Sequence, residues 1–561
     1  MPVHPFTVKP ISQFNDEMEG QQRLRRILGP VALTSLGVGA IIGAGIFVLT
    51  GLAAHNYAGP GLILSFVVAG LGCAFAALSY AEFASMLPVA GSAYTYAYAT
   101  MGELMAWIIG WDLILEYSMA SSAVAVGWSG YVLKLLQLFH VKIPLWLAND
   151  YWTCVGAKAA PGALLEKLAG MGIGADQAQA LIARMPNVHD IDGLTAAVKG
   201  LTLAATANLK EVVVTLQGLA SAQAHLANFT HLDIPVILGI PIAFNLPAFL
   251  VILAVTAILV KGIRESASFN AAMVIIKLAV VLFVIAVGSF YIDPRNWSPF
   301  LPFGFSGVMA GAAYVFFAYI GFDSISTHAE EAVNPQRDVP IGILTSLGVC
   351  TVLYIAVAAV MTGMERYSEI DISAPIASAF VSHGLTAAVL VISVAAVAGI
   401  TSVLLVMMLS QPRVFLAMAR DGLLPRKVFG VVHPKFRTPH RSTMLMGGVV
   451  SLVAALTPIE DIAKMVNIGT LLAFVIVCIA VPIMRRTNPD HHRPFRCPWS
   501  PVIPVLGVVF NGALMFSLGW VNWLRLFVWL AAGLAIYWFY GRHHSTMAEL
   551  AEAKAAGATK P

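Results

Sequence analysis

The segment Ser35-Leu-Gly-Val-Gly-Ala-Ile-Ile-Gly-Ala-Gly-Ile-Phe47 lies in the first long apolar stretch of the chain and carries four glycines. A glycine in a helix interior weakens the helix by about 1 kcal/mol relative to alanine. We therefore expect the first hydrophobic helix to break near Gly43 and Gly45. At membrane depth, a broken helix is tolerated only where its freed N–H and C=O groups are buried in protein or face a polar cavity.

A zwitterionic ligand satisfies both kinds of freed group. Its carboxylate accepts hydrogen bonds from the N–H groups of Ala44 and Gly45, at the positive start of the following half-helix, and its ammonium donates to freed carbonyls. The alternative is that the glycines only allow neighbouring helices to pack closely, as small residues do in membranes.

The composition indicates a bilayer as the solvent. Charged residues make up 11% of the 561 residues, against about 25% in soluble proteins, and the mean hydropathy is +0.81. The net charge of +4 forms no single basic patch, which argues against nucleic-acid binding. The five cysteines show no C-x-x-C spacing, so we expect neither a metal site nor disulfides, and no cofactor.

Apolar stretches long enough to cross a membrane recur along the whole chain. They cover residues 31–56, 59–86, 103–134, 242–260, 266–290, 306–328, 339–363, 383–417, 442–457, 464–484, 501–519 and 523–541. This pattern predicts an all-α integral membrane protein with twelve transmembrane helices. The first 30 residues have no apolar signal-peptide core, so the first span should stay in the membrane.

Cations in the short connections indicate the orientation, because cytoplasmic loops carry an excess of Lys and Arg. They precede span 1 (Arg23, Arg25 and Arg26), separate spans 4 and 5 and spans 8 and 9, and follow spans 10 and 12. All of these fall on one side, which predicts a multi-pass protein of the cell membrane with both termini cytoplasmic. The long segment 135–240 then lies outside, as a cap, a partner site or an insertion without a role in transport.

The sixth span is interrupted as well, at Gly321 within Gly311-Ala-Ala-Tyr-Val-Phe-Phe-Ala-Tyr-Ile-Gly-Phe-Asp323. Interrupted spans at matching positions of two halves indicate an inverted-repeat transporter with its site at mid-membrane. The division that follows is a cytoplasmic segment 1–30, repeat 1 over 31–290 with the insertion 135–240, repeat 2 over 301–485, two further helices over 500–541 and a cytoplasmic tail 542–561.

Four runs give the sequence a recognisable family character. They are Gly39-Ala-Ile-Ile-Gly-Ala-Gly-Ile-Phe47, Phe316-Phe-Ala-Tyr-Ile-Gly-Phe-Asp323, Glu330-Glu-Ala-Val-Asn-Pro-Gln-Arg-Asp-Val-Pro-Ile-Gly342 and Arg420-Asp-Gly-Leu-Leu-Pro425. Together they resemble the amino acid–polyamine–organocation superfamily, specifically its cationic amino acid transporter family. The resemblance implies a leucine-transporter-type fold, with five plus five inverted helices, broken helices 1 and 6 and two extra helices, and proton-coupled uptake in many bacterial members.

The resemblance also implies where the substrate binds. Backbone groups of the two broken spans and one side chain of span 8 contact it, at Ile41, Ala44, Gly45, Phe317, Ala318, Ile320 and Met407. Members that carry arginine tend to have a smaller residue at the position of Met407, so this methionine implies small or medium neutral side chains. Read without the family, a methionine in a membrane helix usually only packs.

Lys277 is the most informative single charge, because it lies near the middle of span 5 between apolar residues. Ionisable groups inside a membrane are functional hypotheses by default. The resemblance places its ammonium at carbonyls of span 1 near Gly43, where sodium-driven relatives of the fold bind a cation, and implies a role in proton coupling. The alternative is a structurally paired or snorkelling lysine.

Glu116 in span 3 matches a membrane-embedded acidic position in the family and is a candidate for the transport pathway. Asp112, one turn earlier, is expected to be solvated or paired, and Glu82 is expected to pair with loop arginines at the cytoplasmic side.

We therefore predict a secondary active transporter that carries a small neutral L-amino acid together with a proton. Two other interpretations are an amino acid exchanger and a membrane sensor or partner-dependent subunit that binds an amino acid without moving it. No nucleophile motif, catalytic carboxylate pair or metal-spaced cluster indicates an enzyme.

Overall fold

The computed structural model describes residues 6–10, 28–87, 92–184, 191–199, 209–261, 267–436 and 438–548. Within them the regular structure is helical, apart from one hairpin of two-residue strands, β1 (Val236–Ile237) and β2 (Ile240–Pro241), and two isolated bridges. The all-α prediction is therefore confirmed. Most of the predicted N-terminal segment, with Arg23, Arg25 and Arg26, and most of the predicted tail lie outside the described residues.

Eight helical segments are long and apolar enough to cross a membrane. They are Gly45–Met86, Glu103–Leu138, Ala272–Tyr291, Gly304–Thr327, Pro335–Met364, Thr386–Arg420, Ile459–Thr487 and Trp520–Ala548. Four shorter apolar helices accompany them, α2 (Pro30–Ile41), α12 (Leu246–Lys261), α20 (His440–Leu456) and α22 (Val502–Ser517). Every predicted span overlaps one of these helices, as expected of a multi-pass membrane protein.

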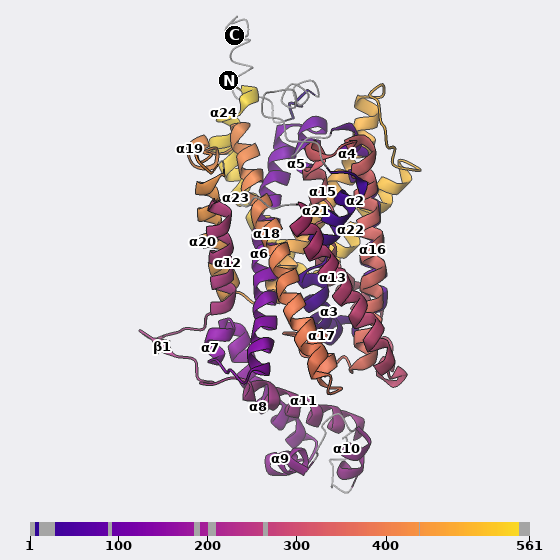
Figure 1. Cartoon of the computed structure of the whole chain (residues 1–561), viewed down its shortest axis with the longest axis vertical. Coiled ribbons are helices and arrows are strands. Elements are labelled where there is room, and N and C mark those ends of the chain that lie inside the picture. Colours follow the sequence, from indigo (N-terminus) through magenta and orange to yellow (C-terminus); the bar gives the residue numbers. More distant parts are fainter. Residues whose placement is uncertain are drawn as a thin grey trace, which may run out of the picture.

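The long helices run side by side along the longest axis of the molecule (Figure 1). The central ones are α4 (Leu62–Met86), α6 (Glu103–Leu138), α16 (Pro335–Met364), α18 (Thr386–Arg420) and α21 (Ile459–Thr487). α6 packs along α18 and α21, and α16 packs along α4 and α2. α13 (Ala267–Gly288) lies against α18, α16 and α2, and α23 (Trp520–Ile536) lies against α21.

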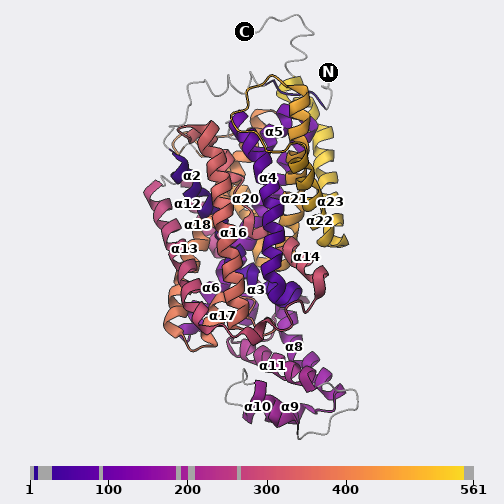
Figure 2. The same cartoon turned by 90° about the vertical axis from the view of Figure 1, so that its right-hand side faces the viewer.

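The two ends of the bundle differ. One end carries the short helices α5 (Ser92–Thr100), α19 (Arg426–Phe429) and α24 (Arg542–His544), and we call it the α5 end. The opposite end carries a helical domain, and we call it the α8 end (Figures 1 and 2).

The domain at the α8 end is formed by residues of the predicted insertion. It contains α8 (Tyr151–Gly170), α9 (Ala175–Arg184), α10 (Ile191–Val198) and α11 (Leu209–Ala227), and the turn α7 (Leu145–Ala148) connects it to the bundle. It has a hydrophobic cluster of its own, which includes Leu168, Ile173, Val212 and Leu216.

The first apolar segment breaks where the glycines predict. α2 ends at Ile41, Ile42 is extended with φ −74° and ψ 100°, and a π-helical segment begins at Gly45 and runs to Leu49. The short helix α3 (Thr50–Ala53) continues from it. The helix axis is thus interrupted over about three residues in the middle of the bundle.

The sixth predicted span breaks in a corresponding way. α14 (Gly304–Val315) passes into a 3₁₀ turn over Phe316–Tyr319, and Ile320 is extended with φ −60° and ψ 134°. Gly321 has φ +118°, a conformation that side chains rarely adopt. The helix resumes as α15 (Ser324–Thr327).

Candidate functional site

The two breaks meet in the centre of the bundle. A Cβ atom added to Gly45 would lie 2.4 Å from Cα of Ala318 and 2.7 Å from its Cβ. A Cβ on Gly321 would lie 3.0 Å from the carbonyl oxygen of Ala40. Only glycine allows the two broken segments to approach this closely.

A narrow cavity lies at this junction, and in this conformation it has room for little more than a water molecule. Its lining side chains are apolar and come from both breaks and from α6 and α18. The lining residues are Ala40, Ile41, Gly43, Ala44, Gly45, Ala120, Val124, Phe317, Ile320, Val403 and Met407.

The structure brings most of the predicted substrate residues to this one cavity. Six of the seven line it, and the seventh, Ala318, lies behind them against Gly45. Ala120, Val124 and Val403 also line it and were not foreseen, because small apolar residues are common in membrane helices. Helical spacing was the available signal, since Val403 lies four residues before Met407 on α18.

The backbone groups beside the cavity differ in how they are satisfied. Tyr354 of α16 donates a hydrogen bond to the carbonyl of Ile41, at 2.8 Å. Asn467 of α21 donates to the carbonyls of Ala313 and Tyr314, at 2.9 and 2.8 Å. The N–H groups of Ala44 and Gly45 begin a helical segment, and the first N–H groups of a helix have no acceptor within it. The cavity therefore has donors at a positive helix start.

Lys277 of α13 is fully buried, with 0% of its surface exposed. Its Nζ donates to the carbonyl oxygen of Gly39 in α2, at 2.7 Å. Gly399 of α18 gives the side chain its room, because a Cβ there would lie 3.1 Å from Cγ of Lys277. We expected the lysine to contact span 1 near Gly43. The acceptor is Gly39, one turn earlier in the chain, and Gly43 lines the cavity.

Three buried carboxyl groups lie toward the α5 end from the cavity. Glu116 precedes the cavity residue Ala120 by one turn of α6, and Asp112 precedes Glu116 by another. Asp323 follows the second break, and the backbone N–H of Gly321 donates to it at 3.3 Å. Among the described residues, Oε1 of Glu116 and Oδ1 of Asp112 have no hydrogen-bond partner.

The prediction for Asp112 was wrong. This side chain is only 1% exposed and forms no ion pair with a described residue, whereas we expected it to be solvated or paired. The reason is that α6 starts at Glu103 and is covered at this level by α21, whose Gly469 lies directly against the carboxyl group.

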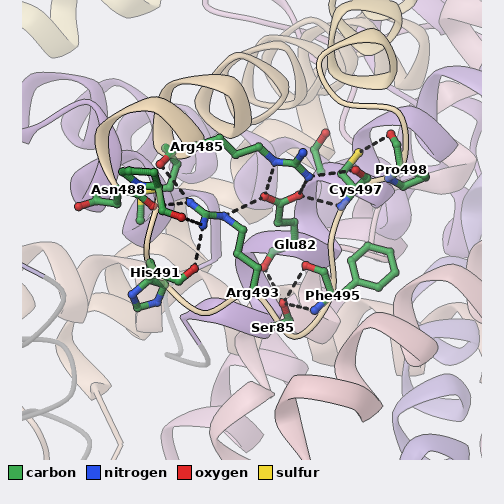
Figure 3. A network of polar contacts seen from close by, with 12 residues as sticks. Glu82, Ser85, Arg485, Asn488, His491, Arg493, Phe495, Cys497 and Pro498 are labelled. Atoms are coloured by element: carbon green, nitrogen blue, oxygen red, sulfur yellow. Dashed lines mark hydrogen bonds and ion pairs between the residues drawn. The ribbon is translucent and has the colours of Figure 1, made fainter.

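Glu82 at the α5 end forms the polar network shown in Figure 3. Arg485 of α21 donates to both of its carboxylate oxygens, at 3.0 and 2.6 Å, and the backbone N–H of Cys497 donates to one of them at 2.7 Å. Nε of Arg493 lies 3.6 Å from the carboxylate. Sequence predicted an arginine partner for this acid, and the structure identifies which arginines they are.

A second polar network lies toward the α8 end. The hydroxyl of Tyr57, in the helical turn Ala54–Ala58, donates to the carboxylate of Glu460 at the start of α21. Lys464 forms an ion pair with the same carboxylate at 2.7 Å, and its Nζ lies 5.4 Å from the centroid of the Tyr57 ring. A polar network thus lies at each end of the bundle, and this one was not predicted.

Comparisons with known proteins agree with the geometry. A family model described as amino acid permease matches residues 28–524. The chain is 44% identical to the branched-chain amino acid permease BcaP of Bacillus subtilis (strain 168), over 97% of this chain and 98% of that protein. It is 40% identical to the methylthioribose transporter of the same organism, over 97% and 99%. It is 36% identical to the vacuolar cationic amino acid transporter 2 of Arabidopsis thaliana, over 86% of this chain and 63% of that protein.

Proposed function

Because the chain belongs to the amino acid permease family, within the amino acid–polyamine–organocation superfamily whose motifs it carries, we propose that it is a proton-coupled symporter of neutral L-amino acids with small or medium side chains. Its relatives are named as permeases and transporters, and the chain is accordingly a transporter and not an enzyme. The observation that carries the proposal is the junction of two broken helices, where six of the seven predicted substrate residues line one narrow cavity.

In this proposal the substrate backbone binds between the breaks. Its carboxylate accepts from the N–H groups of Ala44 and Gly45, at the positive start of the resumed helix. Its ammonium reaches the carbonyls of Phe317 and Ala318 in the 3₁₀ turn and of Ile320, which follows the turn. The side chain points to Met407, whose thioether fills the space that a longer substrate needs.

Lys277 is the proposed coupling group. Its bond to Gly39 connects α13 to the helix that ends at the substrate cavity, and a protonated amine donates to a carbonyl more strongly than a neutral one. Loss of the proton then weakens the connection between α13 and α2. A change of protonation is thereby linked to movement of the first break, beside Gly43. Glu116, one turn from the cavity, is a proposed part of the pathway toward the α5 end.

We further propose that the chain crosses the membrane twelve times. Each of the eight long segments provides one crossing, and each of the four shorter helices provides or begins another. Two inverted repeats of five helices account for the packing, since α4 and α6 then correspond to α16 and α18. Each of these pairs is in contact, and so are the two broken segments. The α5 end is then cytoplasmic, and the domain at the α8 end lies outside the cell.

The polar networks at the two ends of the bundle suit alternating access. We propose that the Glu82 network closes the pathway at one end and that the Glu460 network closes it at the other. Opening the α5 end requires Glu82 to separate from Arg485, and opening the α8 end requires Tyr57 to separate from Glu460. Transport needs these separations to occur in turn.

Uptake of labelled substrate by purified protein in liposomes tests the proposal. The competition panel contains alanine, valine, leucine, arginine and methylthioribose, the last because a relative at 40% identity is named for it. We expect accumulation of a neutral amino acid that depends on an inward proton gradient and is not reduced by arginine. Uptake that requires substrate inside the liposome identifies an exchanger instead. Binding by calorimetry without any flux identifies a sensor.

A further inference from the structure

The hairpin formed by residues 235–242 exposes four large apolar side chains. Val236, Ile237, Leu238 and Ile240 are 64%, 56%, 97% and 65% exposed. The strands pair Val236 with Pro241 and Ile237 with Ile240, so Leu238 and Gly239 form the tip. An isolated two-stranded hairpin with this surface is unstable in water.

The backbone at the tip is unfavourable for the residue that occupies it. Leu238 has φ +54° and Gly239 has φ +79°, as in a type I′ turn. This turn prefers Asn-Gly or Asp-Gly, because a branched side chain is strained in the left-handed region. Leu238 thus combines a strained backbone with an almost fully exposed apolar side chain, and such a combination motivates a search for a function.

The base of the hairpin is fixed to the helix bundle. Phe244 N–H donates to the carbonyl of Trp146 at 2.7 Å, and Asn245 N–H donates to the carbonyl of Ala455 at 3.0 Å. Asn245 also caps α12, since its side chain accepts from the N–H of Ala248 at 3.1 Å. The tip therefore lies close to the α8 end of α12 and α20, and Figure 1 shows it projecting sideways from the molecule there.

The surface of α12 and α20 next to the hairpin is apolar and faces away from the bundle. Leu250 and Leu253 of α12 and Leu452 and Leu456 of α20 are exposed. From residue 234 to residue 260 the sequence contains no Asp, Glu, Lys, Arg or His. The first charged residue before the hairpin is Asp233. It is exposed and forms an ion pair at 2.8 Å with Lys158 of α8, in the domain at the α8 end.

The length of α12 adds an independent reason for lipid as the partner. Its 16 residues span about 24 Å, less than the roughly 30 Å of a bilayer hydrocarbon core. The bilayer surface at the α8 end therefore lies beyond the start of α12, at the level of the hairpin. Backbone groups along the hairpin edges still need water or headgroups, so the hairpin suits the interfacial region and not the core.

We propose that the hairpin 235–242 inserts its tip into the interfacial region of the bilayer leaflet at the α8 end. Leu238 and Ile237 contact acyl chains, and the polar pair Asp233–Lys158 stays at the headgroup level. The hairpin thereby anchors the outer domain of α8 to α11 beside the membrane on the side of α12 and α20. This role is independent of the transported substrate.

The test uses the full-length protein in liposomes with a fluorophore on a single introduced cysteine, in Leu238→Cys and in the control Gln179→Cys, an exposed site on α9. All five native cysteines are buried. Burial, followed by the nearby Asp150 charge, raises the pKa of Cys154 to about 12, so this native thiol of the outer domain is unreactive near neutral pH. Both introduced sites lie at the same end, so mixed insertion into liposomes affects them equally.

We expect nitroxide-labelled lipids to quench the label at position 238 at least three-fold more than the label at position 179, and aqueous iodide to do the reverse. Equal iodide quenching at both sites would overturn the proposal, and so would disulfide cross-linking of Leu238→Cys between two copies, which identifies a second chain as the partner.

A second variant separates the apolar contact from the fold of the turn. Leu238→Asn suits the left-handed backbone and keeps the hairpin, while it removes the apolar tip. With the label on Ile237→Cys, adding Leu238→Asn should reduce quenching by nitroxide lipids by at least half. Unchanged quenching would show that Leu238 does not hold the hairpin in the lipid.

Discussion

Gly45 and Ala318 lie in contact across the centre of the bundle, where the backbone of one broken helix passes the other with no room for a side chain. The Cβ of an alanine at position 45 would be 2.4 Å from Cα of Ala318, and Cβ atoms essentially never approach another atom more closely than 3.0 Å. Because the obstacle is backbone, it cannot rotate away. One of the two breaks must then shift, and both line the proposed substrate site.

Gly45→Ala should therefore abolish most substrate uptake, and the cost of overpacking is about 1–3 kcal/mol. The control is Gly348→Ala in α16, where nothing lies within 4 Å of the added Cβ. Uptake into liposomes and thermal unfolding of the purified variants check this. Normal transport by Gly45→Ala would contradict the assignment of the junction as the substrate site.

Lys277→Ala should remove proton-driven accumulation, since the amine is the proposed coupling group and its bond to Gly39 is lost. Gly399→Ala keeps the amine and presses on its side chain, with a Cβ 3.1 Å from Cγ of Lys277, and should cause a smaller loss. Uptake with and without an inward proton gradient is measured for both variants, beside substrate binding by calorimetry. Gradient-driven accumulation by Lys277→Ala equal to that of the unaltered protein would exclude the role in coupling.

Met407→Ser should widen the range of substrates toward larger or cationic side chains, because Met407 lines the cavity. Met408→Ser is a matched control, since the neighbouring methionine is equally buried, at 3% exposed, and is not a lining residue. Competition of labelled alanine uptake by valine, leucine and arginine gives the profile. If both variants keep the substrate profile of the unaltered protein, Met407 does not belong to the substrate site.

The sequence predicted the parts of the site that depend on backbone chemistry. Glycine density placed the break at Gly43 and Gly45 correctly, because the helix cost of glycine is local and does not depend on neighbours. The cavity walls at Ala120 and Val403 were not predictable, since their position depends on how α6 and α18 pack. The same limit explains the wrong expectation for Asp112, which is buried by Gly469, more than 350 residues later in the chain.

The same limit applies to predicting which charged residues pair with each other. Glu82 was expected to meet a loop arginine, yet only the folded chain brings it to Arg485 and Arg493, about 400 residues away. For the contact between Tyr57 and Glu460, the only sequence signal was weak. It was the i,i+4 spacing of Glu460 and Lys464 on one helix face. That pair alone does not indicate what lies opposite.

Glu82→Gln should open the α5 end. Removing the carboxylate charge leaves Arg485 and Arg493 facing one another without an anion, and breaking a buried ion pair costs about 3–5 kcal/mol. Cys497 reports the opening, because its N–H donates to Glu82 and its thiol is buried. Burial, followed by the Glu82 charge, raises the pKa of this thiol to about 11, and both causes weaken when the network opens.

We therefore expect maleimide to alkylate Cys497 at least ten-fold faster in Glu82→Gln than in the unaltered protein at the same pH. Cys154, buried in the domain at the opposite end, serves as the internal control, and its rate should not change. Mass spectrometry of the labelled peptides separates the two sites. If both cysteines react faster, the variant has loosened the whole fold; if neither does, Glu82 does not hold this end closed.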